Sequence, residues 1–147
     1  VSVKVVIDTN IWVSSLLNPS GFPARLRQLF EEGTLHVINS EPLLEEIAEV
    51  LNRPRIKDKY GISETDIKEL LTLIEERTEH VLLSGDNTIC RDRDDNFVIE
   101  TAIKGQAAFL ITRDDDIKFS KEVSSFLLPY GIRIISIAKF LTFMIKA

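Results

Sequence analysis

The chain alternates between short apolar runs and longer stretches in which apolar residues recur every three or four positions. Five runs are rich in β-branched and other apolar residues, and they cover residues 3–7, 35–39, 81–83, 109–112 and 132–135. A run that is apolar on both faces is typical of a strand buried in a parallel sheet. In the segments between these runs, the apolar residues have the spacing of a helix. The pattern therefore predicts an α/β fold with a parallel sheet and helices on both faces.

Turn and capping residues mark where the predicted helices begin and end. Pro23 can open a helix that Gly33 ends, because proline is tolerated in the first turn and glycine follows helix ends. Ser63 with Asp66 resembles a capping box for a helix that ends near Arg77. The other expected helices cover 11–17, 41–53 after a Ser40 N-cap, 96–105, and the residues after a Ser136 N-cap, where Ile137, Phe140, Leu141, Met144 and Ile145 face inward.

Length, composition and net charge exclude several classes of protein. We expect a single domain over residues 1–147, because a chain of this length buries a sizeable core. The lone Cys90 excludes an internal disulfide, and His36 and His80 make no zinc pattern. No apolar run approaches the ~20 residues of a membrane span and no secretory signal pattern is present, so we expect a cytoplasmic protein with no membrane segment. The net charge of −5 argues against a bulk positive field for nucleic acid, but not against nucleic acid as a transient substrate.

Four acids fall at comparable places in the predicted topology. Asp8 directly follows the first strand and Asp114 follows the fourth by two residues, so both lie at the carboxyl edge of the sheet, where open parallel sheets bind ligands. Residues 84–94 form a loop long enough to bring Asp95, at the start of the next helix, back to this edge. Glu46 lies one turn into the helix after the second strand, at the border of its apolar face.

Each of these acids also has an ordinary structural interpretation. Asp8 can be a turn or N-cap residue, and Asp94 or Asp95 can cap the following helix. Glu46 and the acids of 114–116 can be solvated. The coincidence of four acids in one topology favours a shared cation over four separate roles. Carboxylate oxygens with no Cys or His select Mg²⁺ or Mn²⁺ over zinc.

In order along the chain, four segments resemble the motifs of the PIN domain family, the PilT N-terminus-like metal-dependent ribonucleases. The segments are VVIDTNIWVSSLL, SEPLLEEIAEVLNRP, RDRDDNFVIETA and FLITRDDDI. Each motif alone is weak, but the ordered set covers nearly the whole chain. The arrangement is closest to the prokaryotic branch of toxin components of toxin–antitoxin pairs.

The resemblance implies a five-stranded parallel sheet in the order 3-2-1-4-5 and one or two Mg²⁺ or Mn²⁺ ions. It implies that the catalytic metal ligands are Asp8, Glu46, Asp95 and Asp114, and that Asn10, Ser40, Thr112 and Asp116 are auxiliary. The third motif departs from the family pattern, because it carries three aspartates and Arg93 where relatives often have proline. This departure leaves Asp94 as a rival to Asp95.

The expected activity is hydrolysis of RNA phosphodiester bonds by a metal-dependent endoribonuclease. The basic residues Arg53, Arg55, Lys57 and Lys59 are expected to hold the RNA, although exposed Arg and Lys more often only solvate a surface. The alternative is a PIN-like scaffold that binds RNA or protein without catalysis. Expected partners are an antitoxin protein and further copies of the chain, in a homodimer or higher homo-oligomer. Residues 11–13 and the apolar C-terminus are the candidate surfaces.

The motifs of other α/β protein families that have an aspartate after the first strand match this sequence less well. A haloacid-dehalogenase-like phosphatase needs a second aspartate where Asn10 stands. A response-regulator receiver needs an aspartate after the third strand, at 83–85, and a lysine where Ser136 stands. There is also no Gly-rich phosphate loop.

Overall fold

The computed structural model describes residues 3–84, 93–113 and 121–146, and of residues 93–95 and 146 it describes the backbone alone. The strands are β1 (Val3–Ile7), β2 (Leu35–Ser40), β3 (Glu79–Val81), β4 (Phe109–Thr112) and β5 (Arg133–Ser136). The helices are α1 (Thr9–Leu17), α2 (Phe22–Glu31), α3 (Glu41–Leu51), α4 (Pro54–Lys57), α5 (Glu64–Arg77), α6 (Arg93–Gly105), α7 (Lys121–Leu127) and α8 (Ile137–Lys146), with the short 3-10 helix η1 (Leu128–Tyr130).

The described strands form one five-stranded sheet in the order β3-β2-β1-β4-β5, with every pair parallel. β1 lies at the centre, and its Val5 and Val6 are fully buried because helices cover both faces. The predicted fold class and the predicted strand order are both confirmed.

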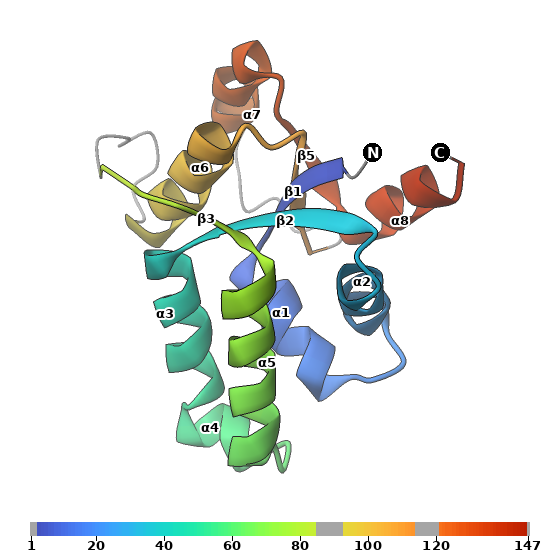
Figure 1. Cartoon of the computed structure of the whole chain (residues 1–147), viewed down its shortest axis with the longest axis vertical. Coiled ribbons are helices and arrows are strands. Elements are labelled where there is room, and N and C mark those ends of the chain that lie inside the picture. The colour runs from blue at the N-terminus through green and yellow to red at the C-terminus, as the bar shows by residue number, and fades with distance from the viewer. Residues whose placement is uncertain (1–2, 85–92, 114–120, 147) are drawn as a thin grey trace.

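The core is divided into two hydrophobic clusters, one on each face of the sheet. α6 and α7 cover the face that carries Val6 and Leu110. The remaining long helices cover the opposite face, where Trp12 packs edge-to-face on Phe30 with ring centroids 5.2 Å apart. Figure 1 shows α6 and α7 on one side of the sheet and α1, α3 and α5 on the other. α3 contributes to both clusters, so it lies at the boundary between the two layers.

The third strand ends earlier than the expected range of 81–83. β3 begins at Glu79, directly after Thr78 closes α5 by donating to the Ile74 carbonyl at 2.6 Å. Its last residue, Val81, pairs with Ser40, which is the last residue of β2. Because β2 turns into α3 at this point, no neighbouring strand remains to pair with residues 82–83.

Two further boundaries differ from the prediction. α6 begins at Arg93 rather than at residue 96, so Asp94 and Asp95 lie inside its first turn and neither is the N-cap. Carboxylates in a first turn suit the helix dipole, which accounts for the longer helix. β5 covers 133–136 rather than 132–135, because the Ile132 amide bonds the Leu127 carbonyl instead of joining the ladder.

The C-terminal helix follows the prediction except at its end. The Ser136 hydroxyl accepts from the Lys139 amide at 3.3 Å, and Ile137, Phe140 and Leu141 are buried. Ile145 is exposed, so its predicted inward orientation is wrong. The short helices α4, α7 and η1 were not predicted. No helix in the described part of the chain is long and apolar enough to cross a membrane.

Candidate active site

A row of polar residues crosses the carboxyl edge of the sheet. Ser40 ends β2, Thr112 ends β4, and Ser136 pairs with Thr112 at the end of β5. Val5 pairs with Val37 and Ile7 with Ile111, so the same parallel register continued to residue 8 places Asp8 between Ser40 and Thr112. Neighbouring strands lie about 4.8 Å apart, so these positions are adjacent.

The polar row lies on the α6 face of the sheet. Side chains alternate along a strand, so Asp8 shares a face with Val6, Ser40 with Ile38, and Thr112 with Leu110. The three apolar residues belong to the cluster packed under α6. The sheet therefore presents an apolar layer under this helix that becomes polar at its carboxyl edge.

Asp8 is buried, with 2 % of its surface exposed. Its backbone holds the turn between β1 and α1, because its amide donates to the Ile111 carbonyl at 3.1 Å and its carbonyl accepts from the Ile11 amide at 3.0 Å. Asp8 occupies the N-cap position of α1, yet its carboxylate makes no capping hydrogen bond. Asp8 is therefore a turn residue through its backbone, and its carboxylate does not cap α1.

Ser40 also lacks its expected capping bond. It stands at the N-cap position of α3 without a side-chain cap, and its hydroxyl is 2.8 Å from the Thr101 hydroxyl on α6. Thr101 in turn donates to the Phe97 carbonyl at 2.7 Å. The Ser40 side chain thus joins the edge of the sheet to α6, which fixes the helix beside Asp8.

Glu46 lies in the middle of α3 and is partly exposed, whereas its neighbour Glu45 is exposed as predicted. It follows Leu43 by one turn, and Leu43 is packed in the cluster under α6. α3 and α6 are in contact. Glu46 is therefore on the flank of α3 that borders the polar row.

The structure describes the other predicted site residues only in part. α6 runs antiparallel to the strands, since Gly105 at its C-terminus lies against Ile38 in β2 and Thr101 lies against Ser40. Its first turn, with Asp95, therefore lies beyond the carboxyl edge of the sheet, as expected. Asp114 and Asp116 lie outside the described residues. Asn10 is exposed in the first turn of α1, two residues after Asp8.

Sequence reasoning missed a buried acid, Glu100, which lies on α6 with 1 % of its surface exposed. Its carboxylate accepts from the Ser84 amide at 2.5 Å and from the Ser84 hydroxyl at 2.9 Å. It thereby holds the segment that follows β3 against α6. The available signal was the place of Glu100 in the most apolar part of α6, between Phe97-Val98-Ile99 and Ala102-Ile103.

In the part of the chain that the structure describes, the buried Thr9 hydroxyl and the buried Asn39 amide nitrogen have no hydrogen-bond partner. Thr9 is the first residue of α1, directly after Asp8, and Asn39 directly precedes Ser40 in β2, so each is the sequence neighbour of a member of the polar row. Leaving a buried donor unpaired costs about 1–3 kcal/mol. Such groups are concentrated at the same edge as the candidate site.

The predicted RNA-binding residues are largely engaged with neighbouring side chains. Arg53 pairs with Glu49 at 2.9 Å, and Lys57 pairs with Glu64 at 2.7 Å. The hydrogen bond from Lys57, and then its charge, lower the pKa of Glu64 below its usual value. The Lys59 ammonium lies 5.4 Å from the ring centroid of Tyr60. This basic segment is α4 with its flanking residues, at the end of α3 remote from the sheet (Figure 1).

The side chains that the structure describes around the polar row offer ligand atoms that suit a hard divalent cation. Asp8, Glu46, Ser40 and Thr112 offer only oxygen atoms, which Mg²⁺ and Mn²⁺ prefer. Among the residues that the structure describes, no three acids, histidines or cysteines gather closely enough to hold an ion. Two of the four predicted ligands are in that part of the chain with their side chains, and the other two are not.

Comparison with known proteins agrees with the topology. A family model described as "PIN domain" matches residues 4–116. The chain is also 32% identical over 127 residues to the uncharacterized protein MJ1680 of Methanocaldococcus jannaschii, a match that covers 86% of this chain and 81% of that protein. The chain therefore belongs to the PIN domain family, whose members are generally nucleases that act on RNA or DNA with divalent metals.

Proposed function

We propose that the chain is a metal-dependent endoribonuclease that hydrolyses RNA phosphodiester bonds. The observation that carries the proposal is the buried Asp8, held between Ser40 and Thr112 at the carboxyl edge, with a carboxylate that caps no helix. Open parallel sheets bind ligands at this edge, and carboxylate oxygens are the ligands that Mg²⁺ and Mn²⁺ prefer, so a carboxylate at this place favours a cation.

Asp8, Glu46, Asp95 and Asp114 would hold Mg²⁺ or Mn²⁺, with Asn10, Ser40, Thr112 and Asp116 as auxiliary residues. When bound, the metal would supply an activated water and neutralise the developing charge on phosphate. The chain's own residues position these oxygens. The turn at Asp8 is fixed by two backbone hydrogen bonds, and the Ser40 to Thr101 contact fixes the helix that carries Asp95.

Several finer expectations remain part of the proposal. The enzyme would be cytoplasmic and would be the toxin of a toxin–antitoxin pair, with an antitoxin protein as its partner. It would form a homodimer or higher homo-oligomer. Of the two surfaces expected for such contacts, residues 11–13 are buried in the core and are unavailable, while Phe143 and Ile145 on α8 are exposed.

The test is cleavage of single-stranded and structured RNA with Mg²⁺ or Mn²⁺, with and without chelator. Asp8→Asn should lower the cleavage rate by about 100-fold or more, because it removes a ligand from a cation that contributes several kcal/mol to transition-state stabilisation. Glu45→Gln is the matched control, because Glu45 is an exposed neighbour of Glu46. Cleavage that survives both chelator and Asp8→Asn would contradict the proposal and favour a non-catalytic PIN-like scaffold.

A further inference from the structure

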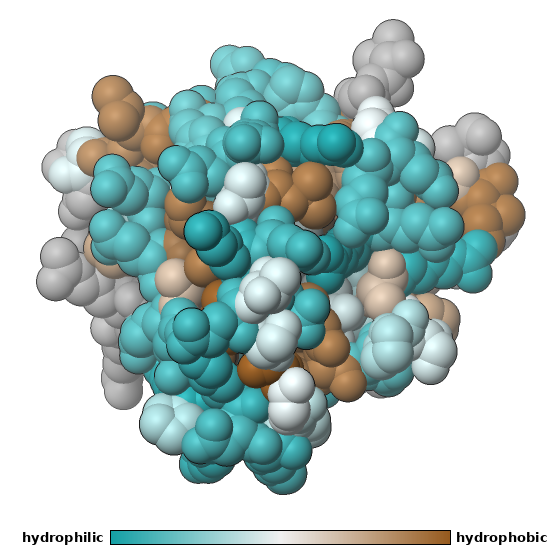
Figure 2. Space-filling model, turned by 60° about the horizontal axis from the view of Figure 1, so that its bottom comes forward, coloured by the Kyte–Doolittle hydropathy of each residue, from teal (hydrophilic) through white to brown (hydrophobic). Residues whose placement is uncertain are grey.

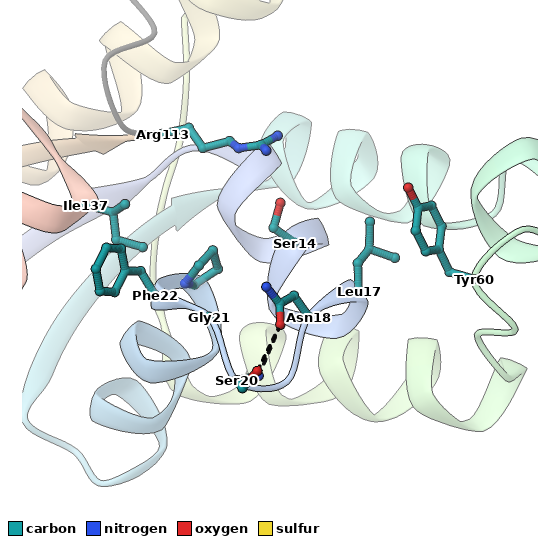
Figure 3. A pocket seen from close by; sticks show the side chains of 10 residues that line it. Ser14, Leu17, Asn18, Ser20, Gly21, Phe22, Tyr60, Arg113 and Ile137 are labelled. Carbon is teal, nitrogen blue, oxygen red and sulfur yellow. Dashed lines mark hydrogen bonds between the residues drawn. The ribbon is translucent and has the colours of Figure 1, made fainter.

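A groove of about 610 Å³ opens beside the candidate active site, on the face of the sheet opposite α6. It is bounded by the end of α1, the start of α2, the residues after α4 and the ends of β4 and β5. Ser14, Asn18, Gly21, Phe22, Tyr60 and Arg113 are among its lining residues (Figure 3). Among the residues that the structure describes, no acid lines the groove.

The groove is continuous with the carboxyl edge of the sheet through Arg113. This residue directly follows Thr112, the β4 member of the polar row. In the described part of the chain Arg113 forms no ion pair, and its side chain is exposed. A guanidinium that pairs with no carboxylate among the described residues can bind a phosphate close to the candidate active site.

Polar groups on the groove floor suit the same kind of ligand. Gly21 is the N-cap of α2 and offers no side-chain cap, and α2 is long enough to carry a dipole. Asn18 lies beside Gly21 at this helix end, and Ser14 lies between Asn18 and Arg113 (Figure 3). Hydroxyl and amide groups of this kind bind sugar and phosphate oxygens without reading sequence.

Two aromatic rings border the groove from opposite sides. The exposed fractions of Phe22 and Tyr60 are 52 % and 47 %, and the two rings are separated by Ser14 and Asn18 in Figure 3. An exposed ring beside a phosphate-binding group is how proteins hold unpaired bases, because every base has a face that stacks. The face of the molecule seen in Figure 2 is mostly hydrophilic, with smaller hydrophobic areas among the polar side chains and at the edges of the view.

We propose that this groove holds a single-stranded segment of the RNA substrate next to the bond that is cut. Arg113 contacts a backbone phosphate, and Tyr60 and Phe22 stack on bases. Stacking of this kind requires unpaired bases, so the groove selects single strands over duplexes and tolerates any sequence. The inference rests on the proposed ribonuclease function for the identity of the ligand.

The test is binding of a labelled single-stranded RNA of about twelve nucleotides, measured by fluorescence anisotropy in EDTA so that the strand stays intact. Tyr60→Ala should weaken binding by roughly tenfold, the scale of one lost stack. Arg113→Ala should weaken binding and also reduce the slope of log affinity against log salt by about 0.7, the value for one phosphate on a single strand. A duplex of the same length should bind more weakly.

Matched controls come from the other side of the molecule. Tyr130 is 53 % exposed on η1, and Arg133 is exposed on β5 without an ion pair in the described part of the chain. Tyr130→Ala and Arg133→Ala should bind RNA within about twofold of the parent chain, since neither residue lines the groove. All four substitutions alter exposed side chains, and equal melting temperatures would verify that the variants fold.

The groove and the nuclease proposal can fail separately. Loss of RNA binding in the groove variants, with no metal-dependent cleavage by the parent chain, would support the groove and reject the nuclease. If cleavage depends on Asp8 but its KM is unchanged in Tyr60→Ala and Arg113→Ala, the proposal of RNA binding in the groove is contradicted, whereas the proposed nuclease activity is supported. Equal weakening by groove and control variants would also overturn the groove proposal.

Discussion

At the scale of single residues, the helical repeat separates the positions of two neighbouring acids, Asp94 and Asp95. Position 94 precedes Thr101 by seven residues, and Thr101 is bonded to Ser40 on β2. Position 95 precedes Ala102 by seven, and Ala102 is buried with Val6 and Leu110, which belong to β1 and β4. Seven residues are about two helical turns, so position 95 is aligned with Ala102 along α6 and position 94 with Thr101.

The resemblance to the PIN domain family implies Asp95 as the metal ligand, with Asp94 as its rival, and the two can be separated by substitution. We expect Asp95→Asn to lower kcat/KM for RNA cleavage by about 100-fold or more, because it removes a charged ligand. Asp94→Asn, the matched control in the same turn, should lower kcat/KM by less than about tenfold. Single-turnover cleavage assays of both variants provide the measurement, and the reverse order of effects would assign the ligand to Asp94.

A second residue-scale feature is the hydroxyl pair that joins the sheet to α6. Thr101→Val keeps the side-chain shape but leaves the fully buried Ser40 hydroxyl without its partner. We expect the free energy of unfolding to fall by about 1–3 kcal/mol, the cost of an unpaired buried polar group. Denaturant unfolding measures this change.

The control for that variant is Thr142→Val on α8. Thr142 also donates to the carbonyl four residues earlier, at 3.1 Å, but it is exposed. Water can replace the lost bond there, so the stability should change by less than about 0.5 kcal/mol. Equal losses in the two variants would show that the Ser40 contact contributes nothing beyond the local helix bond.

At the scale of elements, the close approach of α6 to the sheet depends on Gly105. A Cβ at this position would lie 2.6 Å from the Ile38 Cδ1 and still closer to its Cγ2, so the helix or the strand would have to move. Gly105→Ala should therefore destabilise the fold by about 1–3 kcal/mol, although alanine favours helices, because overpacking outweighs propensity.

The test of this explanation is a double-mutant cycle with Ile38→Ala. Truncating Ile38 removes the atoms that the new methyl group would meet, so Gly105→Ala should be neutral or stabilising in that background. Chemical denaturation of the four proteins gives the coupling energy. Additive effects would mean that the clash with Ile38 is not the cause.

At the scale of the whole molecule, the proposed metal site predicts a link between divalent cations and stability. Binding to the folded state alone stabilises it by about 2.7 kcal/mol when the free metal is at 100 times its Kd. For a domain of this size this corresponds to a rise in Tm of roughly 5–10 °C. Thermal unfolding in MgCl₂, compared with NaCl at equal ionic strength, measures the effect.

Asp8→Asn should reduce the Mg²⁺-dependent shift in Tm, and Glu45→Gln should leave it unchanged. This readout does not depend on finding the right RNA substrate. A melting temperature that stays constant across millimolar Mg²⁺ and Mn²⁺ would count against a metal site formed by these carboxylates.

The sequence alone determined the fold class, because β-branched runs and helical spacing alternate in a way that fits only a parallel sheet with helices on both faces. It also determined that Asp8 would lie at the carboxyl edge of the sheet, because a residue directly after a parallel strand lies at the carboxyl end of that strand. The boundaries that depended on local signals, such as the Ser63 cap with its 3.0 Å bond from the Asp66 amide, were predicted well.

The tertiary structure decided what depends on partners distant in sequence. β3 ends at Val81 because β2 stops pairing there, and Ser40 bonds Thr101 rather than capping its own helix because α6 packs across that edge. The groove beside Arg113 joins residues from α1, α2, β4 and the segment after α4, which no local pattern brings together. Pairing and packing between remote segments set these features, so they cannot be read from periodicity within any one segment.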